Sequence, residues 1–94
     1  MILSIIIPCF NEKKTIIRID NKILSIKKIK KQIIIIDDLS NDGTRDIIRK
    51  QISKKVDKVI YHKKNLGKGA AIKSAIKYIK GDLVIIQDAD LEYE

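Results

Sequence analysis

The stretch IIIIDDLSNDG, residues 33–43, decides the fold of this chain. It opens with four consecutive isoleucines, and an apolar run without alternation is typical of a strand buried on both faces, as in a parallel sheet. The residues that follow are mostly acids, serine, asparagine and glycine, which favour turns. We therefore expect a buried strand over residues 33–36 that ends in a polar loop.

Three similar apolar runs lie on either side of this stretch, at residues 2–7, 56–61 and 83–86. Between the runs, apolar residues recur at the three- and four-residue steps of amphipathic helices, at residues 16–26, 47–52 and 72–79. Strands that alternate with helices run parallel, and right-handed crossovers then build an open sheet. The sequence predicts an α/β fold: a Rossmann-like open parallel sheet with the element order βαβαβαβ.

Local signals set the expected ends of these elements. Pro8 should stop the first strand, because proline has no N–H group to donate to a neighbouring strand. Asn11 is expected to cap the helix that follows, and Gly81 to end the third helix at its C′ position. The outer face of that third helix would carry solvated lysines, Lys73, Lys77 and Lys80.

Length and composition restrict the class of protein. The chain has 94 residues, 45% of them hydrophobic, which suffices for one small domain. A single cysteine, Cys9, excludes an internal disulfide framework, and we expect it to be a small buried side chain. A single histidine, His62, excludes histidine-rich metal sites, argues against a Ser-His-Asp triad and is expected to lie exposed in a loop. No apolar run is long enough to span a bilayer and no signal peptide is visible, so we expect a cytoplasmic protein.

The formal net charge of +8 makes nucleic-acid binding a candidate function. Basic residues concentrate in segments 1–31 and 62–80, whereas acids collect at 37–46 and 82–94, so the basic charge is not spread uniformly along the chain. Aromatic residues make up only 4%, too few for the stacking platform of a single-strand-binding protein. A basic nucleic-acid-binding protein is therefore only the alternative, and we expect no nucleic acid partner. The surplus lysines would instead permit peripheral contact with the inner face of an anionic membrane.

Polar residues suited to chemistry follow the expected strands. Ligands of open parallel sheets bind beyond the carboxyl ends of the strands. Asp88 and Asp90 leave the last strand with one residue between them, and two such carboxylates can chelate one divalent ion, Mg²⁺ or Mn²⁺. The ion would neutralise charge on a departing diphosphate. Alternatively, the two acids only form a turn.

The other candidates also have structural alternatives. Asp37 and Asp38 point in different directions at a strand end, so one can accept hydrogen bonds from a ligand while the other faces backbone amides. Alternatively, both acids cap the helix that starts near Thr44. Loop 65–69, NLGKG, can approach a phosphate through its glycines or form a simple tight turn. Glu12 is either a site residue or a helix-start residue favoured by the helix dipole.

Four blocks of the sequence, taken together, resemble glycosyltransferase family 2 in order and spacing. They are PCFNE (8–12), IIDDLSNDGT (35–44), NLGKGAA (65–71) and DADL (88–91). They are most similar to the branch of dolichyl- and polyprenyl-phosphate mannose or glucose synthases, with its P-x-[YF]-N-E, V-D-D-x-S-x-D-G-T and D-A-D-L blocks. The resemblance implies the GT-A fold, of which residues 1–94 would be the N-terminal, nucleotide-sugar-binding half.

The resemblance also implies which residues bind the nucleotide sugar: Pro8, Phe10, Glu12, Ile36, Asp38, Asp88, Ala89, Asp90 and Glu92. Within this set, Ile36 and Asp38 would contact the base and ribose. The pair Asp88 and Asp90 would hold the metal ion and the diphosphate. Leu39 departs from the family pattern, which has a small or polar residue after the paired acids.

The implied function is transfer of a sugar, with inversion, from a nucleotide-diphosphate donor to a polyprenyl phosphate, as in cell-envelope glycan synthesis. Such an acceptor is already an anionic nucleophile and makes few demands on a general base, and no catalytic residue can be assigned in this chain. The chain would supply the donor and metal site and would be inactive alone. A non-catalytic nucleotide-binding module of the same fold class is the alternative.

Overall fold

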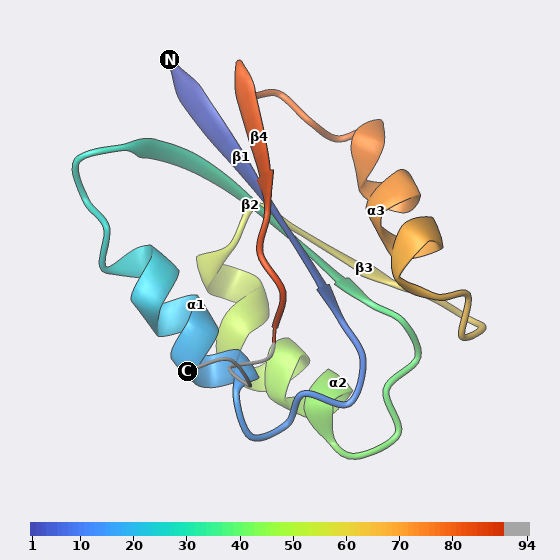
Figure 1. Cartoon of the computed structure of the whole chain (residues 1–94). Helices are drawn as coiled ribbons and strands as arrows, with labels where there is room; N and C mark the ends of the chain where they lie inside the picture. The colour runs from blue at the N-terminus through green and yellow to red at the C-terminus, as the bar shows by residue number, and fades with distance from the viewer. Residues whose placement is uncertain (90–94) are drawn as a thin grey trace.

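The computed structural model describes residues 1–89, which build one sheet from four strands (Figure 1). The strands are β1 (Ile2–Cys9), β2 (Lys30–Asp37), β3 (Lys58–Tyr61) and β4 (Leu83–Ile86). All of them run parallel, in the order β3-β2-β1-β4. The chain thus extends the sheet in one direction from β1 to β3 and returns to place β4 on the other side of β1. This arrangement confirms the predicted fold class.

Three helical segments connect the strands. They are α1 (Ile16–Leu24), a continuous segment made of α2 (Thr44–Ile47), the π-helical η1 (Ile48–Ile52) and the 3₁₀-helical η2 (Ser53–Lys55), and finally α3 (Lys68–Ile76). Figure 1 shows α1 and α2 on one side of the sheet and α3 on the other. Within residues 1–89, no helix has the length and apolar character needed to cross a membrane.

The core has two layers because successive side chains of a strand point to opposite faces of the sheet. Ile5, Ile7, Ile33 and Ile35 face α1 and η1, where they pack in one cluster with residues such as Ile16. The alternate strand residues Ile6, Ile34 and Ile36 face α3, where they form the second cluster with Ala71 and Ala75 of that helix. Both central strands are therefore buried on both faces, as the isoleucine run of β2 predicts.

Pro8 lies inside β1, so the prediction that it stops the strand is wrong. The bonding pattern of β1 explains why it is tolerated. Cys9 accepts a hydrogen bond from the N–H of Asp38 on the β2 side, and Ile6 accepts one from Gln87 on the β4 side. The backbone N–H and C=O groups of even-numbered residues in β1 therefore point towards β4. The pairing of β4 with β1 ends at Ile6. The missing N–H of Pro8 is directed to a side where no strand partner follows.

The predicted helix ends are also corrected. Asn11 does not cap α1, which begins at Ile16, and its backbone is left-handed with φ 54°. Gly81 is not the C′ residue of α3, which already ends at Ile76. Glycine is required at position 81 for a different reason: a Cβ atom there would lie 2.5 Å from Oγ of Ser4 and 2.7 Å from the carbonyl oxygen of Ile2.

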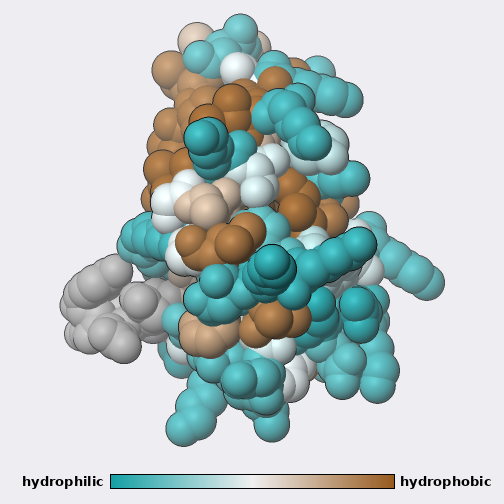
Figure 2. All heavy atoms as spheres, turned by 90° about the vertical axis from the view of Figure 1, so that its right-hand side faces the viewer, coloured by the Kyte–Doolittle hydropathy of each residue, from teal (hydrophilic) through white to brown (hydrophobic). Residues whose placement is uncertain are grey.

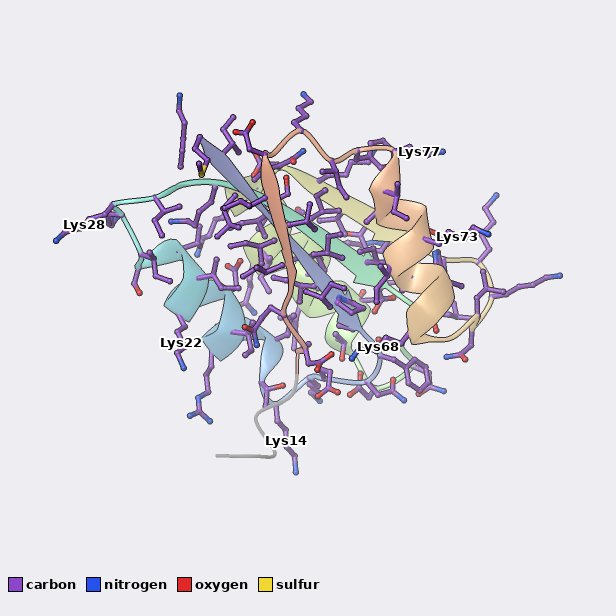
Figure 3. The ribbon with its side chains drawn as sticks, turned by 45° about the horizontal axis from the view of Figure 1, so that its top comes forward. Lys14, Lys22, Lys28, Lys68, Lys73 and Lys77 are labelled. Atoms are coloured by element: carbon purple, nitrogen blue, oxygen red, sulfur yellow. The ribbon has the colours of Figure 1, made fainter. Side chains whose placement is uncertain are left out.

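Helix α3 presents its smallest residues to the sheet. Ala71 and Ala75 are fully buried, whereas Ile76 is 57% exposed, although the spacing of isoleucines predicted Ile76 on the buried face. Small side chains let the helix backbone approach β1 and β2 closely. The lysines Lys73 and Lys77 are exposed on the outer side of the helix, as predicted (Figure 3).

Candidate functional site

A cleft of about 270 Å³ opens at the carboxyl ends of the strands, next to the point where the strand order reverses between β1 and β4. Open α/β sheets bind ligands at such switch points. Its lining comes from the loop after β1, the ends of β2 and β4 and the start of α3: Pro8, Cys9, Phe10, Glu12, Asp38, Lys68, Ala71, Asp88 and Ala89. Segments from four separate parts of the sequence therefore meet in one cavity.

Most of the residues predicted for the site line this cleft together: Pro8, Phe10, Glu12, Asp38, Asp88 and Ala89. Ile36 is not among the lining residues, because it is fully buried between the sheet and α3. Asp90 and Glu92 lie outside the described residues. Lys68, from the loop expected to approach a phosphate or to form a tight turn, lines the same cleft.

Side-chain hydrogen bonds tie the loops around the cleft to one another. Asn11 donates its backbone N–H to Oγ of Ser40 at 2.9 Å, and its side-chain Oδ1 accepts from the N–H of Asn41 at 2.8 Å. Thr15, just before α1, donates its hydroxyl to the carbonyl oxygen of Ala89 after β4. The loops after β1, β2 and β4 are thus held in fixed positions relative to one another.

Asp37 is an anchor in the core. Its carboxylate pairs with Nε of Arg45 at 2.6 Å and accepts hydrogen bonds from the hydroxyl and the N–H of Ser40. Arg45 also donates from Nη2 to the carbonyl oxygen of His62 at 2.8 Å. Asp37 therefore joins the end of β2 to α2 and to the segment after β3, and it is fully buried.

Asp38 faces backbone amides and lines the cleft. Oδ1 accepts hydrogen bonds from the N–H of Leu66 at 2.9 Å and from Nδ1 of His62 at 2.7 Å, and Oδ2 accepts from the N–H of Gly67 at 2.8 Å. Burial alone would raise the pKa of Asp38, but these hydrogen bonds and the charge of the imidazole outweigh it and lower the pKa below its usual value. The carboxylate is therefore ionised at neutral pH.

The alternative that Asp37 and Asp38 cap the helix at Thr44 is wrong. Gly43 is the N-cap residue, and the acid bonded to the start of the helix is Asp42, whose Oδ1 accepts a hydrogen bond from the N–H of Thr44 at 3.0 Å. The two neighbouring acids at the end of β2 are engaged elsewhere, Asp37 with an arginine and Asp38 with the loop before α3. Their opposite orientations follow from their alternating positions at the strand end.

His62 is buried, with 7% of its surface exposed, so the prediction of an exposed loop residue is wrong. Its Nδ1 contacts Asp38, and its Nε2 lies 2.8 Å from Oγ of Ser74 on α3. The order Asp38, His62, Ser74 is that of a Ser-His-Asp triad, which the single histidine had argued against. Ser74 nevertheless sits inside a helix whose backbone N–H groups are used for helical hydrogen bonds, so they are not available as oxyanion donors.

Lys68 and Asp88 form an ion pair across the cleft. Lys68 lies in the first turn of α3, directly after Gly67, whose φ of 92° is the left-handed conformation that favours glycine. Figure 3 shows Lys68 beside the ends of the strands, whereas Lys22 and Lys28 extend away from the molecule. The pair joins the start of α3 to the segment after β4.

Cys9 also lines the cleft, but its chemistry is restricted. Burial raises the pKa of its thiol far above the usual value, and the negative charge of Asp37 raises it further. The thiol stays protonated, which makes it a poor nucleophile and a poor metal ligand. The prediction of a small buried side chain is confirmed.

Three acids line the described part of the cleft: Glu12, Asp38 and Asp88. Asp38 is engaged by the loop before α3 and by His62, so Glu12 and Asp88 are the acids suited to a hard cation. Within residues 1–89, no group of three or more His, Cys, Asp or Glu side chains is close enough together to hold a metal ion by itself. Mg²⁺ and Mn²⁺ are often bound by only one or two carboxylates, with water and phosphate oxygens completing the shell. The described residues therefore fit a metal that a bound phosphate helps to hold.

Comparison with known proteins identifies close similarity over nearly the whole chain. A dolichol-phosphate mannosyltransferase of Pyrococcus furiosus is 33% identical over 97 residues, covering 99% of this chain and 27% of the relative. The mannosyltransferase PcManGT from Pyrobaculum calidifontis, solved with GDP-Man and Mn²⁺, superimposes with a TM-score of 0.82 at 25% identity, covering 94% of this chain and 27% of that one. S. aureus TarS 1-349 in complex with UDP-GlcNAc gives a TM-score of 0.81 at 29% identity, covering 96% and 27%.

This chain therefore spans less than a third of the length of these relatives. The model of the family described as Glycosyl transferase family 2 matches residues 4–94. The chain belongs to glycosyl transferase family 2.

Proposed function

We propose that the cleft binds the nucleotide part of a nucleotide-diphosphate sugar, and that the chain is the donor-binding part of an inverting glycosyltransferase. The observation that carries this proposal is that residues from all four blocks, 8–12, 35–44, 65–71 and 88–91, line one cavity at the switch point of the sheet. The relatives solved with GDP-Man and UDP-GlcNAc support a nucleotide-sugar ligand. Asp38 would accept a hydrogen bond from the nucleoside.

A divalent ion would sit near Asp88, with Asp90 as its second carboxylate. The Mn²⁺ in the solved mannosyltransferase supports such an ion, and Mg²⁺ satisfies the same oxygen ligands. When bound, the ion neutralises charge on the diphosphate leaving group. Lys68, now paired with Asp88, would lie beside the same phosphates and add a second positive charge.

The acceptor that we propose is a polyprenyl phosphate, because the similar Pyrococcus furiosus protein is a dolichol-phosphate mannosyltransferase. In the reaction, a phosphate oxygen of the acceptor would attack the anomeric carbon from the face opposite the leaving group. The new C–O bond forms as the bond to the nucleoside diphosphate breaks. The acceptor oxygen is already anionic, so no proton has to be removed by a base.

The direct test is titration of the 94-residue chain with GDP and UDP in the presence of diamagnetic Mg²⁺, followed by NMR of the backbone amides, with the Mn²⁺ dependence of the affinity measured by calorimetry. We expect shifts at the cleft residues, and we expect Asp88→Asn to weaken the Mn²⁺-dependent part of binding. Asp46→Asn is the matched control, because Asp46 is an exposed acid on α2, away from the cleft lining. Equal binding by wild type and Asp88→Asn would contradict the metal assignment.

We also propose that this chain alone binds nucleotide weakly and does not transfer sugar. The reason is that the chain spans 27% of the length of each of the relatives described above, so most of the residues of those proteins have no counterpart in it. The measurement is transfer of radiolabelled sugar from GDP- and UDP-sugars to a polyprenyl phosphate by the purified chain. Clear turnover would contradict this proposal.

A further inference from the structure

We propose that His62 is a positioning residue, whose imidazole occupies Oδ1 of Asp38 and thereby leaves Oδ2 as the acceptor for a hydrogen-bond donor of the nucleoside. This inference rests on the proposed function, because it assumes that Asp38 contacts the nucleotide. It adds a residue that lies outside the cleft lining and acts only through Asp38.

The hydrogen-bond capacity of the carboxylate supports this role. Each carboxylate oxygen can accept about two hydrogen bonds. Oδ1 already has two donors, the N–H of Leu66 and Nδ1 of His62, whereas among the described residues Oδ2 has one, the N–H of Gly67. One acceptor position therefore remains on Oδ2, suited to a ribose hydroxyl or a base N–H.

The imidazole is itself held from three directions. An ionised Asp38 can only accept, so Nδ1 of His62 must donate, and Nε2 is satisfied by the hydroxyl of Ser74, which can donate or accept. The backbone of His62 is fixed as well, because its N–H donates to the carbonyl oxygen of Asp37 and its carbonyl accepts from Arg45. The ring thus links the end of β2 to α3 in one geometry.

Substitution of His62 by asparagine or glutamine tests the hydrogen bonds of its two ring nitrogens separately. In His62→Asn the side-chain N–H₂ group takes the place of Nδ1 and can still donate a hydrogen bond to Asp38. In His62→Gln the longer side chain places its N–H₂ group where Nε2 was, so it can hydrogen-bond to Ser74 and not to Asp38. His62→Ala removes both contacts, and Ser74→Ala removes only the link to α3. Urea unfolding of every variant reports stability independently of the other measurements.

The first measurement needs no ligand: the titration of the Asp38 carboxyl carbon by NMR in the 94-residue chain. We expect the pKa of Asp38 to rise in His62→Ala and His62→Gln, because a donor to the charged form is lost. It should stay near the wild-type value in His62→Asn and Ser74→Ala. An unchanged Asp38 pKa in His62→Ala would overturn the proposal, and if that variant does not fold, His62→Gln decides in the same way.

The second measurement is the affinity for GDP and UDP with Mn²⁺. We expect about tenfold weaker binding in His62→Ala and His62→Gln, the effect of one charge-assisted hydrogen bond, and near-wild-type binding in His62→Asn. If binding instead follows stability across all four variants, His62 is structural and the proposal is overturned. If wild type binds neither nucleotide, the proposed function fails, whereas the Asp38 titration still decides whether His62 positions that carboxylate.

Discussion

Strands β2 and β4 have almost the same apolar composition and opposite environments. Ile33–Ile36 of β2 are 0 to 3% exposed, whereas the residues of β4, Leu83–Ile86, are 45 to 54% exposed. β2 pairs with β1 and β3 and is covered by helices on both faces, but β4 pairs with β1 at the edge of the described sheet. An apolar run therefore predicts a strand, while its neighbours decide how deeply that strand is buried.

The exposure of β4 involves both of its faces. Successive side chains of a strand alternate between faces, and all four side chains of β4 are about half exposed. Figure 2 shows the resulting hydrophobic surface in the upper part of that view. β2 thus contributes to stability through burial, whereas β4 is held mainly by its hydrogen bonds to β1 and by the segment that leads into it.

The largest expected effect is a difference in stability between alanine substitutions in the two strands. Ile35→Ala should lower the free energy of unfolding by about 3 kcal/mol, because it leaves a cavity in a fully buried site. Ile85→Ala should cost less than about 1 kcal/mol, because the side chain is already half exposed. Urea unfolding followed by circular dichroism measures both values. Similar losses at the two positions would show that β4 is buried in solution.

A smaller effect tests how β4 is attached. Gly81→Ala should destabilise the chain by about 2 kcal/mol, because the new methyl group would collide with Ser4 and with the backbone of Ile2. Gly69→Ala is the matched control: nothing lies within 4 Å of its Cβ position, and alanine favours the helix by about 0.5 kcal/mol. Amide exchange should accelerate in β4 more than in β2. Equal stability of the two variants would contradict this close packing.

The loop after β2 contains strain that a glycine should relieve. Leu39 has a left-handed backbone with φ 62°, and its side chain is partly exposed, so little burial is lost on replacement. We expect Leu39→Gly to stabilise the chain by about 0.5 to 1 kcal/mol. Glycine removes the steric cost of the left-handed backbone, but part of that gain is offset because glycine loses more conformational entropy on folding. Leu66→Gly, at an exposed leucine without positive φ, should destabilise it. Thermal unfolding compares the two, and a loss of stability in Leu39→Gly would exclude strain at this position.

The contrast between β2 and β4 shows which features of the fold can be predicted from the sequence: those set by local patterns, and not those set by distant neighbours. The element order and the cleft at the carboxyl ends follow from local patterns, because apolar runs and turn-forming residues are read within a few positions. The position after a strand places Asp38 and Asp88 at this edge of the sheet, whereas the site role of Phe10 follows only from the resemblance to glycosyltransferase family 2.

What the sequence does not predict depends on contacts between distant segments. Nothing near His62 indicates that it meets Asp38 and Ser74, and nothing near Gly81 indicates that it packs against Ser4. Asn11 resembles a helix cap locally, yet its side chain binds the loop after β2. The exposure of β4 has the same origin, since its local sequence matches that of a central strand.

The smallest expected effect on stability concerns a buried acid of helix α1. Asp20 of α1 is buried, and its Oδ1 has no hydrogen-bond partner among the described residues. Burial raises the pKa of Asp20, although Lys55 partly opposes this. The folded state therefore binds this proton more tightly than the unfolded state, so the stabilising contribution is full below the unfolded pKa and is lost as the pH rises through the folded pKa.

Asp20→Asn should remove that loss, because the amide carries no charge at any of these pH values. We expect the variant to be more stable than wild type by about 0.5 kcal/mol at pH 7, a gain limited because asparagine also buries polar atoms. The difference should shrink as the pH is lowered towards the unfolded pKa of the acid. Asp46→Asn, at an exposed acid, is the control in urea unfolding at several pH values. If the difference in stability between Asp20→Asn and wild type stays constant with pH, the carboxylate of Asp20 is solvated in the folded state and its pKa is not raised by burial.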